Sequence, residues 1–257
     1  MRDYHVHTRW SDGRDTAEEM VLSAIRLGMA EIGFSDHTPM PYPADWTMKP
    51  EELPLYKEEI RALAEKYGDR ISILCGVERD ALSPDMDVNF DYVIGSTHVI
   101  PGPDGALLAV DHSAGMTEAN VREHCGGDGY AYAEAYFASE ARVVELTHCD
   151  IIGHFDLVAK YNETLHSFDE SHPRYRAAWQ AAADRLLETG VPFEINTGAI
   201  ARGCRSIPYP APEIREYLAA HGAKFILSSD SHATETIGYQ FEKWKSCVTG
   251  STEIIAK

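Results

Sequence analysis

Short apolar segments with polar ends recur along the chain. Segments such as "ISILCGVE" at 71–78 and "KFILSSDSH" at 224–232 are rich in aliphatic residues and finish in charged or polar ones. Their length and composition predict buried β-strands. Strands of this kind are expected at residues 3–7, 30–37, 71–78, 91–98, 150–154, 191–196 and 224–232.

Amphipathic segments lie between the predicted strands and indicate helices. In "TAEEMVLSAIRLG", at 16–28, Thr16 and Glu19 have the spacing of a capping box, and Gly28 is a typical helix stop. Similar patterns predict helices around residues 54–67, 130–142, 174–189 and 212–221.

The alternation of strands and helices predicts an α/β fold with a parallel sheet covered by helices. In a chain of 257 residues it favours one domain, spanning 1–257, with a (β/α)7 barrel that is one unit short of the TIM type. The connections at 101–129 and 156–173 are long and contain Gly, Pro, Asp and His. We expect them to be loops that partly cover a site.

Each predicted strand finishes, at its carboxyl end, in a side chain that can bind a metal ion or a substrate. In β/α barrels this end of the strands carries the active site, and residues two apart in a strand point to the same face. A single histidine there is often only structural, but the repetition from strand to strand favours a metal site. The candidates are His5, His7, His37, Glu78, His98, His154, Asn196, Asp230 and His232.

Other histidines are weaker candidates. His148 lies near the start of the strand that ends at His154 and stays an alternative to it as a ligand. We set aside the histidines of predicted loops and helices, which are His112, His124, His166, His172 and His221.

The candidate ligands are imidazole nitrogens and carboxylate oxygens, without thiolates. This donor set suits Zn, Fe, Mn or Co rather than a structural cysteine-rich zinc site. There are more ligands than one ion needs, and a carboxylate such as Glu78 can bridge two ions about 3.5–4 Å apart, as in two-metal hydrolases. The pattern therefore predicts metal-assisted hydrolysis.

Composition narrows the class of partner. The formal net charge is −18, which argues against a basic surface for long nucleic acid but allows a small anionic substrate held by local cations. The cysteines are scattered and odd in number, as expected for free thiols in a reducing compartment. No signal-like segment or long apolar stretch is present, so we expect a cytoplasmic protein without membrane association.

The motifs "DYHVHT", "SDH", "GVE", "GSTH", "GHFDL" and "SSDSH" occur in this order at the predicted strand ends. Together, from Asp3 to about Gly238, they resemble the polymerase and histidinol phosphatase (PHP) superfamily. "DYVIGSTHVI", "GHFDLVAKY" and "FEINTGAIARG" are most similar to its monofunctional histidinol-phosphatase branch.

The resemblance implies a distorted seven-stranded barrel and a trinuclear metal site. It implies that one ion is held by His5, His7, Glu78 and Asp230 and a second by Glu78, His98 and His154. The third would be held by Asp12, His37 and His232. We take Glu78, Asp230 and His232 as the candidate catalytic residues.

Phosphate binding calls for cations beside the metal ions. Arg202 and Arg205 follow the strand that ends at Asn196, and Lys160 follows His154. We expect these residues, Asn196 included, to contact the substrate, with Arg202 first among them. Related sequences often carry arginine where this chain has Lys160, and lysine acts as a point charge rather than a bidentate donor.

These observations predict a metal-dependent phosphomonoesterase that uses two to three divalent ions. The resemblance implies hydrolysis of L-histidinol phosphate in histidine biosynthesis. The alternatives are a PHP phosphoesterase acting on nucleotides or short oligonucleotides and, outside phosphate chemistry, a metal-dependent amidohydrolase or a non-catalytic metal-binding protein. The sequence leaves open which group protonates the leaving alkoxide.

Overall fold

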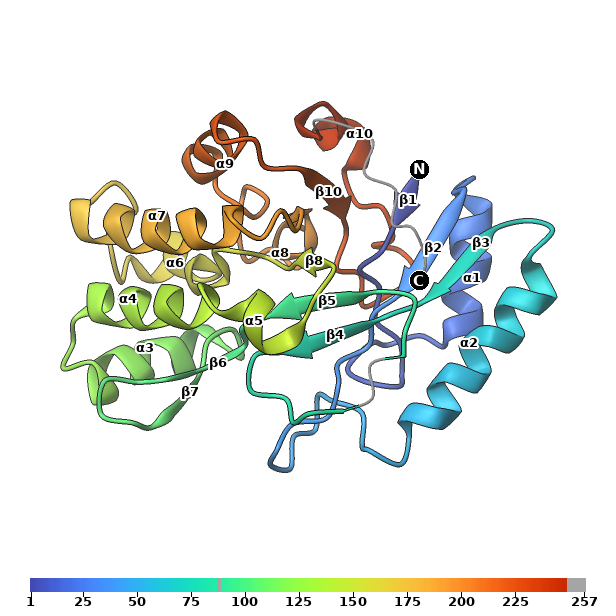
Figure 1. Cartoon of the computed structure of the whole chain (residues 1–257), viewed down its shortest axis with the longest axis horizontal. Coiled ribbons are helices and arrows are strands. Elements are labelled where there is room, and N and C mark those ends of the chain that lie inside the picture. The colour runs from blue at the N-terminus through green and yellow to red at the C-terminus, as the bar shows by residue number, and fades with distance from the viewer. Residues whose placement is uncertain (87–88, 249–257) are drawn as a thin grey trace.

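Parallel strands lie at the centre of the molecule, and helices surround them (Figure 1). The computed structural model describes residues 1–86 and 89–248; the last part of the predicted domain, 249–257, lies outside them. One parallel sheet has the strand order β1-β2-β3, and a second has the order β10-β9-β8-β5-β4. The strands are β1 (Arg2–Asp3), β2 (Glu31–Phe34), β3 (Ser72–Cys75), β4 (Val77–Asp80), β5 (Val93–Ser96), β8 (Ile151–Ile152), β9 (Phe193–Asn196) and β10 (Phe225–Ser228).

The predicted α/β class and the parallel pairing are confirmed, but the described strands do not form one continuous closed ladder. Isolated parallel bridges join the two sheets, one between Val6 and Ser231 and one between His37 and Glu78. The barrel is therefore distorted, and both junctions fall among the predicted metal ligands.

The strand predicted over 71–78 is broken at Gly76 into β3 and β4. The Gly76 nitrogen donates to the Phe34 carbonyl (2.9 Å), whereas the Val77 nitrogen donates to the Tyr92 carbonyl (3.3 Å). The chain therefore leaves one sheet and joins the other at this point. A Cβ on Gly76 would lie 2.4 Å from the ring of Tyr92, so only glycine fits the crossing.

The helices lie where the amphipathic segments predicted them, within a few residues. α1 begins with the expected capping box of Thr16 and Glu19. The predicted helices are α1 (Ala17–Arg26), α2 (Leu53–Tyr67), α4 (Gly129–Glu140), α7 (Pro173–Leu187) and α9 (Pro212–Ala220). Further helical segments are α5 (Val143–Thr147), α8 (Gly198–Ala201), α10 (Phe241–Trp244) and the 3-10 helix η2 (Lys245–Cys247).

The two long connections are not plain loops, which corrects the sequence prediction. The first contains an antiparallel hairpin of β6 (Val99–Pro101) and β7 (Leu107–Ala109), followed by α3 (Ala114–His124). Ser113 caps α3 by accepting a hydrogen bond from the Met116 nitrogen. The second contains η1 (Leu157–Ala159) and α6 (Asn162–Leu165). Glycine and polar residues hid these short elements because their hydrophobic periodicity is weak.

A small apolar layer fills the space between the two sheets. Its side chains come from strands of both sheets and are buried: Tyr4, Leu74, Tyr92, Ile94, Ile151 and Ile226. The larger core lies between the strands and the helices. This small layer packs the two sheets against each other.

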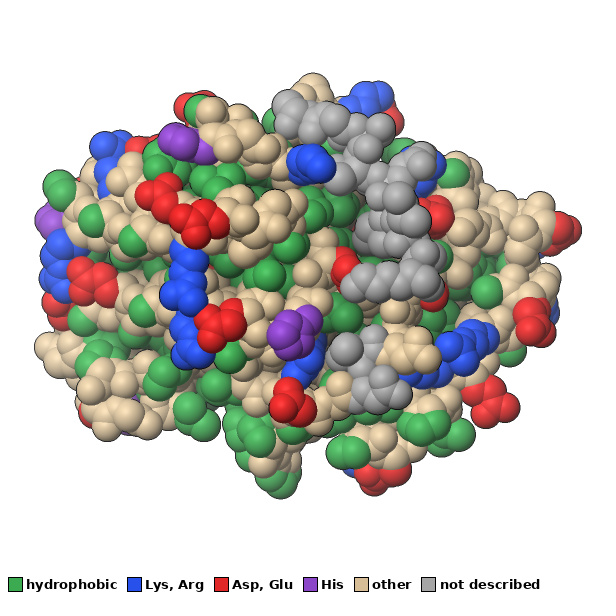
Figure 2. Space-filling model, in the orientation of Figure 1, with side chains coloured by type: hydrophobic (Ala, Val, Ile, Leu, Met, Phe, Trp, Pro, Cys, Tyr) green, Lys and Arg blue, Asp and Glu red, His purple; other side chains and the backbone are tan. Residues whose placement is uncertain are grey.

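The molecular surface mixes charges of both signs. On the face shown in Figure 2, Lys and Arg side chains lie beside Asp and Glu rather than in one continuous basic patch. Within residues 1–86 and 89–248, no helix has the length and apolar character needed to cross a bilayer.

Candidate metal centre and active site

The bridge between Val6 and Ser231 sets the register of four candidate ligands. The His7 nitrogen donates to the Ser231 carbonyl (2.8 Å), and the Ser231 nitrogen donates to the His5 carbonyl (3.0 Å). Because neighbours of a bridged residue point to the opposite face, His5 and His7 on one segment and Asp230 and His232 on the other turn toward the same pocket. Imidazole Nε2 of His7 lies 3.4 Å from Asp230 Oδ1.

A tight turn brings Asp12 to the same place. The Gly13 nitrogen donates to the Thr8 carbonyl (2.9 Å), and a Cβ on Gly13 would lie 2.6 Å from the Thr8 backbone. The buried carboxylate of Asp36 accepts hydrogen bonds from the Thr8 nitrogen (2.8 Å) and from Ser11 Oγ (2.6 Å). The sequence analysis did not single out Asp36, although it directly precedes His37.

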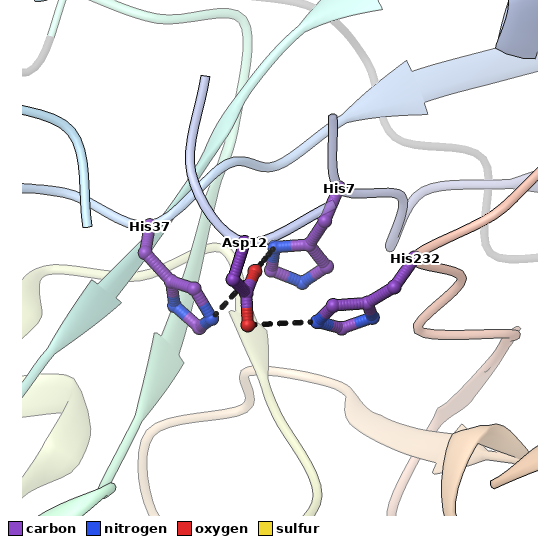
Figure 3. Close-up of side chains that lie close together, drawn as sticks. All are labelled: His7, Asp12, His37 and His232. Atoms are coloured by element: carbon purple, nitrogen blue, oxygen red, sulfur yellow. Dashed lines mark hydrogen bonds and ion pairs between the residues drawn. The ribbon is translucent and has the colours of Figure 1, made fainter. Parts of the chain in front are cut away.

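Asp12 lies at the centre of a cluster with His7, His37 and His232 (Figure 3). Its Oδ1 is 3.6 Å from His7 Nδ1 and 3.7 Å from His37 Nε2, and its Oδ2 is 3.2 Å from His232 Nε2. The predicted third set of ligands is thus assembled, and His7 lies beside it as well.

Glu78 occupies the centre of the remaining ligands. Its Oε2 lies 3.2 Å from His5 Nε2 and 3.0 Å from His37 Nδ1. Its Oε1 lies 3.4 Å from His98 Nε2 and 3.0 Å from His154 Nε2. One carboxylate therefore faces two different groups of imidazoles, one through each oxygen, which is the geometry a bridging ligand needs.

The burial of these groups fits a metal centre. Nε2 of His5, both ring nitrogens of His7 and Oε2 of Glu78 are buried and have no hydrogen-bond partner within the described part of the chain. Buried polar atoms are costly without partners, and a cation supplies one to all of them. Ligand atoms lie within 4.8 Å of one another, which suits a divalent ion, in each of four overlapping sets of described residues: His7, Asp12, His37 and His232; His5, Glu78 and His154; His5, His7 and Asp230; and His37, Glu78 and His98.

Electrostatics favour the metal-binding forms of Glu78 and His37. At His5 and His98, by contrast, burial lowers the pKa, but neighbouring carboxylates outweigh it and raise the pKa above the usual range. Burial raises the pKa of Glu78, but the imidazoles of His5, His37 and His98 outweigh it, so the pKa lies well below the usual range. Burial lowers the pKa of His37 to about 4, which leaves the ring neutral near pH 7. Metal ligands must be in these deprotonated forms.

Glu194, on β9, contacts two candidate ligands, His5 and His154, on the side away from the cluster. The sequence analysis did not single it out. Its Oε1 lies 2.5 Å from His5 Nδ1, and its Oε2 accepts hydrogen bonds from the His154 nitrogen (2.9 Å) and from Asn196 Nδ2 (2.9 Å). A carboxylate at Nδ1 fixes the ring so that Nε2 faces the metal. The signal was available, because Glu194 and Asn196 are two apart on a strand and share a face.

Asp80, on β4, supports His98 in a similar way and was also missed. Its Oδ2 accepts a hydrogen bond from the His98 nitrogen (2.7 Å) and lies 3.3 Å from His98 Nδ1. Asp80 is two residues after Glu78, so spacing again gave the clue.

Two of the predicted phosphate-binding cations line the cavity above the ligands, which has a volume of about 140 Å³. Arg202 Nη2 donates to Asp230 Oδ2 (2.7 Å), and its Nη1 donates to the Asp230 carbonyl (2.9 Å). Lys160 Nζ donates to Asp111 Oδ2 (2.9 Å) and to the Asp111 carbonyl (3.0 Å). Burial lowers the pKa of Lys160, but Asp111 outweighs it and raises the pKa above its ordinary value, so the ammonium stays charged.

Arg205 and Asn196 are placed differently from the prediction. Arg205 is buried, with Nη1 3.0 Å from Asp156 Oδ2 and Nη2 3.5 Å from Glu170 Oε2, and it does not line the cavity. Its strand-end position suggested a rim residue, but these carboxylates draw it into the protein. Asn196 is fully buried and bonds to Glu194 and to the Gly198 nitrogen (2.8 Å), behind the site.

The structure separates His148 from His154. His148 is an exposed residue that ends α5 in the left-handed conformation, with φ 53°. His154 lies beside Glu78, so it is the one of the two that the structure brings to the cluster. Of the histidines set aside, His112 lines a second cavity next to the ligands.

Comparisons with known proteins place this arrangement in a family. A protein named "Probable histidinol-phosphatase" from Deinococcus radiodurans is 30% identical over 93% of this chain and 89% of its own length. Histidinol-phosphatase of Bacillus subtilis is 23% identical over 94% of this chain and 97% of its own length.

A solved structure shares the fold. Histidinol phosphate phosphatase from Lactococcus lactis, complexed with Zn, L-histidinol and phosphate, superposes with a TM-score of 0.73 at 23% identity and covers 96% of this chain and 91% of its own. The family model described as PHP domain matches residues 3–198. The chain therefore belongs to the PHP domain family.

Proposed function

We propose that this protein hydrolyses L-histidinol phosphate to L-histidinol and phosphate. The observation that carries the proposal is a set of imidazole and carboxylate atoms around Glu78 that are buried and have no hydrogen-bond partner among the described residues, next to a cavity lined by Arg202 and Lys160. The names of the relatives, read with the shared fold, support the choice of substrate.

The cofactor we propose is a set of two to three divalent ions, of Zn, Fe or Mn. His5, His7, Glu78 and Asp230 would hold one ion, and Glu78, His98 and His154 a second. Asp12, His37 and His232 would hold the third. When bound, such ions activate water for attack on phosphorus and offset the charge of the phosphoryl oxygens.

The protein's own groups bind and orient the phosphate. Arg202 and Lys160 place a guanidinium and an ammonium at the same cavity, and each is held by a carboxylate, Asp230 and Asp111 respectively. Anchored in this way, they meet the phosphate without losing side-chain freedom on binding, which favours one orientation of the phosphorus. Glu78, Asp230 and His232 are the catalytic residues of the proposal, because they hold the ions that act on the reacting atoms.

The test is a substrate panel assayed on the purified chain after chelation and reloading with Mn, Zn or Fe. It contains L-histidinol phosphate, a nucleoside monophosphate, a phosphodiester and an N-acyl amide. We expect kcat/KM to be highest for L-histidinol phosphate. A comparable or higher value for the nucleotide would favour the nucleotide phosphoesterase instead, and turnover of the amide alone would favour an amidohydrolase.

A further inference from the structure

A second cavity, of about 240 Å³, opens beside the candidate metal ligands, and its lining extends beyond the phosphate-binding groups. It shares His37, His98 and Lys160 with the smaller cavity above the ligands, so the two cavities adjoin. Its wall also includes Asp45 and Trp46, from the segment 39–50, and His112, from the segment after β7. A phosphomonoester whose phosphorus lies at the ligands has its alcohol part within reach of this space.

The wall that carries Trp46 is fixed before any ligand arrives. The ring centroid of Trp46 lies 4.9 Å from that of His37, edge to face, and 5.5 Å from that of His98. The Met48 nitrogen donates to the His37 carbonyl (3.1 Å), and Met48 is buried. Prolines 39, 41, 43 and 50 restrict the backbone of this segment, which lowers the entropy lost when a ligand binds to it.

One carboxylate in the lining of the cavity, that of Asp45, is left without a partner in the described part of the chain. Asp111 is paired with Lys160, and Asp12 is one of the candidate metal ligands. Asp45 is exposed, and within residues 1–86 and 89–248 its carboxylate has no ion pair or hydrogen bond. An aromatic ring and an uncompensated carboxylate at adjacent positions suit a ligand that is both flat and cationic.

We propose that this second cavity binds the leaving-group side of the substrate and selects a cationic alcohol that bears a ring, with Asp45 facing its ammonium group and Trp46 its ring. This inference rests on the proposed function. It adds the residues that set specificity, at a distance from the reacting phosphorus. Because such contacts are made equally in the ground state and the transition state, they should act on KM more than on kcat.

The experiment compares three substrates on the metal-loaded enzyme: L-histidinol phosphate, its N-acetyl derivative, which lacks the ammonium charge, and 4-nitrophenyl phosphate, which lacks the amine altogether. For Asp45→Asn we expect KM for L-histidinol phosphate to rise about fivefold, the size expected of one partly exposed ion pair, with kcat unchanged. KM should not change for the N-acetyl derivative or for 4-nitrophenyl phosphate, neither of which carries the ammonium group. Trp46→Phe should retain part of the selectivity that Trp46→Ala loses.

Asp69→Asn is the matched control, because Asp69 is an exposed aspartate that lines neither cavity and its loss changes the net charge equally. Inhibition by free L-histidinol gives an independent measure, and its inhibition constant should rise in Asp45→Asn but not in Asp69→Asn. An equal change in KM for all three substrates, or no change for any, would overturn the assignment of Asp45. Failure of the proposed function looks different, because the wild-type enzyme would then turn over 4-nitrophenyl phosphate but not L-histidinol phosphate.

Discussion

Arg202 reaches Asp230 twice, through Nη2 to the carboxylate (2.7 Å) and through Nη1 to the main-chain carbonyl (2.9 Å). Asp230 itself has a positive φ of 50°, which is uncommon for a residue other than glycine. The guanidinium of Arg202 thus stabilises a backbone conformation of Asp230 that is unfavourable by itself. Asp230 faces the ligand cluster. Arg202 therefore has two roles to separate by experiment, one toward phosphate and one toward Asp230.

The first prediction separates these roles. Arg202→Ala should lower kcat/KM by roughly tenfold to a hundredfold, since a charge-assisted hydrogen bond contributes about 1.5–3 kcal/mol. Inhibition by inorganic phosphate should weaken in parallel with kcat/KM, which measures the role toward phosphate. Elemental analysis measures the role toward Asp230: we expect the metal content to stay unchanged, and a loss of metal would show that Arg202 acts by positioning Asp230. Arg202→Lys should recover only part of the loss because it removes the bidentate contact. Wild-type kinetics in Arg202→Ala would rule out a phosphate contact.

The second prediction concerns Glu78, whose two oxygens face different imidazoles. Glu78→Ala should lose activity by several orders of magnitude and release more than one equivalent of metal, because a shared ligand serves two ions at once. His37→Ala should deplete mainly one ion, and Glu65→Ala, an exposed residue of α2, should change neither quantity. Circular dichroism checks that the fold survives. A Glu78→Ala protein that kept its full metal complement would mean that Glu78 is not a bridge.

The third prediction assigns Arg205 to stability rather than to substrate binding. Its side chain and that of Asp156 are almost fully buried and lie 3.0 Å apart. Arg205→Met should lower the free energy of unfolding by about 3–5 kcal/mol, because it leaves a buried carboxylate without its cation. In urea denaturation, the double variant Arg205→Met with Asp156→Asn should be more stable than Arg205→Met alone. If Arg205→Met were as stable as wild type but had a raised KM, Arg205 would instead contact the substrate.

The fourth prediction concerns Glu140, at the end of α4. Burial raises its pKa to about 8, and neither carboxyl oxygen has a hydrogen-bond partner within the described residues. The folded state then holds a proton that the unfolded state releases near pH 4.5. Its contribution to stability is therefore full below pH 4.5 and is lost as the pH rises toward 8.

Glu140→Gln cannot release this proton, so its stability relative to wild type should increase between about pH 5 and pH 8, by up to about 1.4 kcal/mol for each pH unit. Urea denaturation of both metal-free proteins across this range provides the measurement, with chelator present so that metal binding does not contribute. A difference in stability that does not change with pH would show that Glu140 titrates normally.

Much of the fold could be predicted from local sequence patterns, because short apolar segments and helix caps act over a few residues. The capping box of Thr16 and Glu19, for example, lies within a single turn. The break at Gly76 was not predictable in this way, since the ring that forces it, Tyr92, comes from a different segment. The composition of residues 71–78 is that of one continuous strand.

The candidate site shows the same division. Strand-end position was enough to find His5, His37 and Glu78, because parallel strands align their carboxyl ends. It misplaced Arg205, whose direction depends on Asp156 and Glu170, both distant in sequence. It also passed over Asp45 and Trp46, which lie in a proline-rich connection with no strand to point to them.

The bridge between Val6 and Ser231 ties the site to the order in which the chain is made. His5 and His7 leave the ribosome well before Asp230 and His232, which lie far later in the sequence. No nascent fragment that ends before Asp230 and His232 holds the full set of candidate ligands, so the centre cannot be completed until these two residues have been synthesised. The α/β units between the two pairs of residues have to form first and bring the pairs together, since such a long closure costs entropy that only the intervening contacts offset.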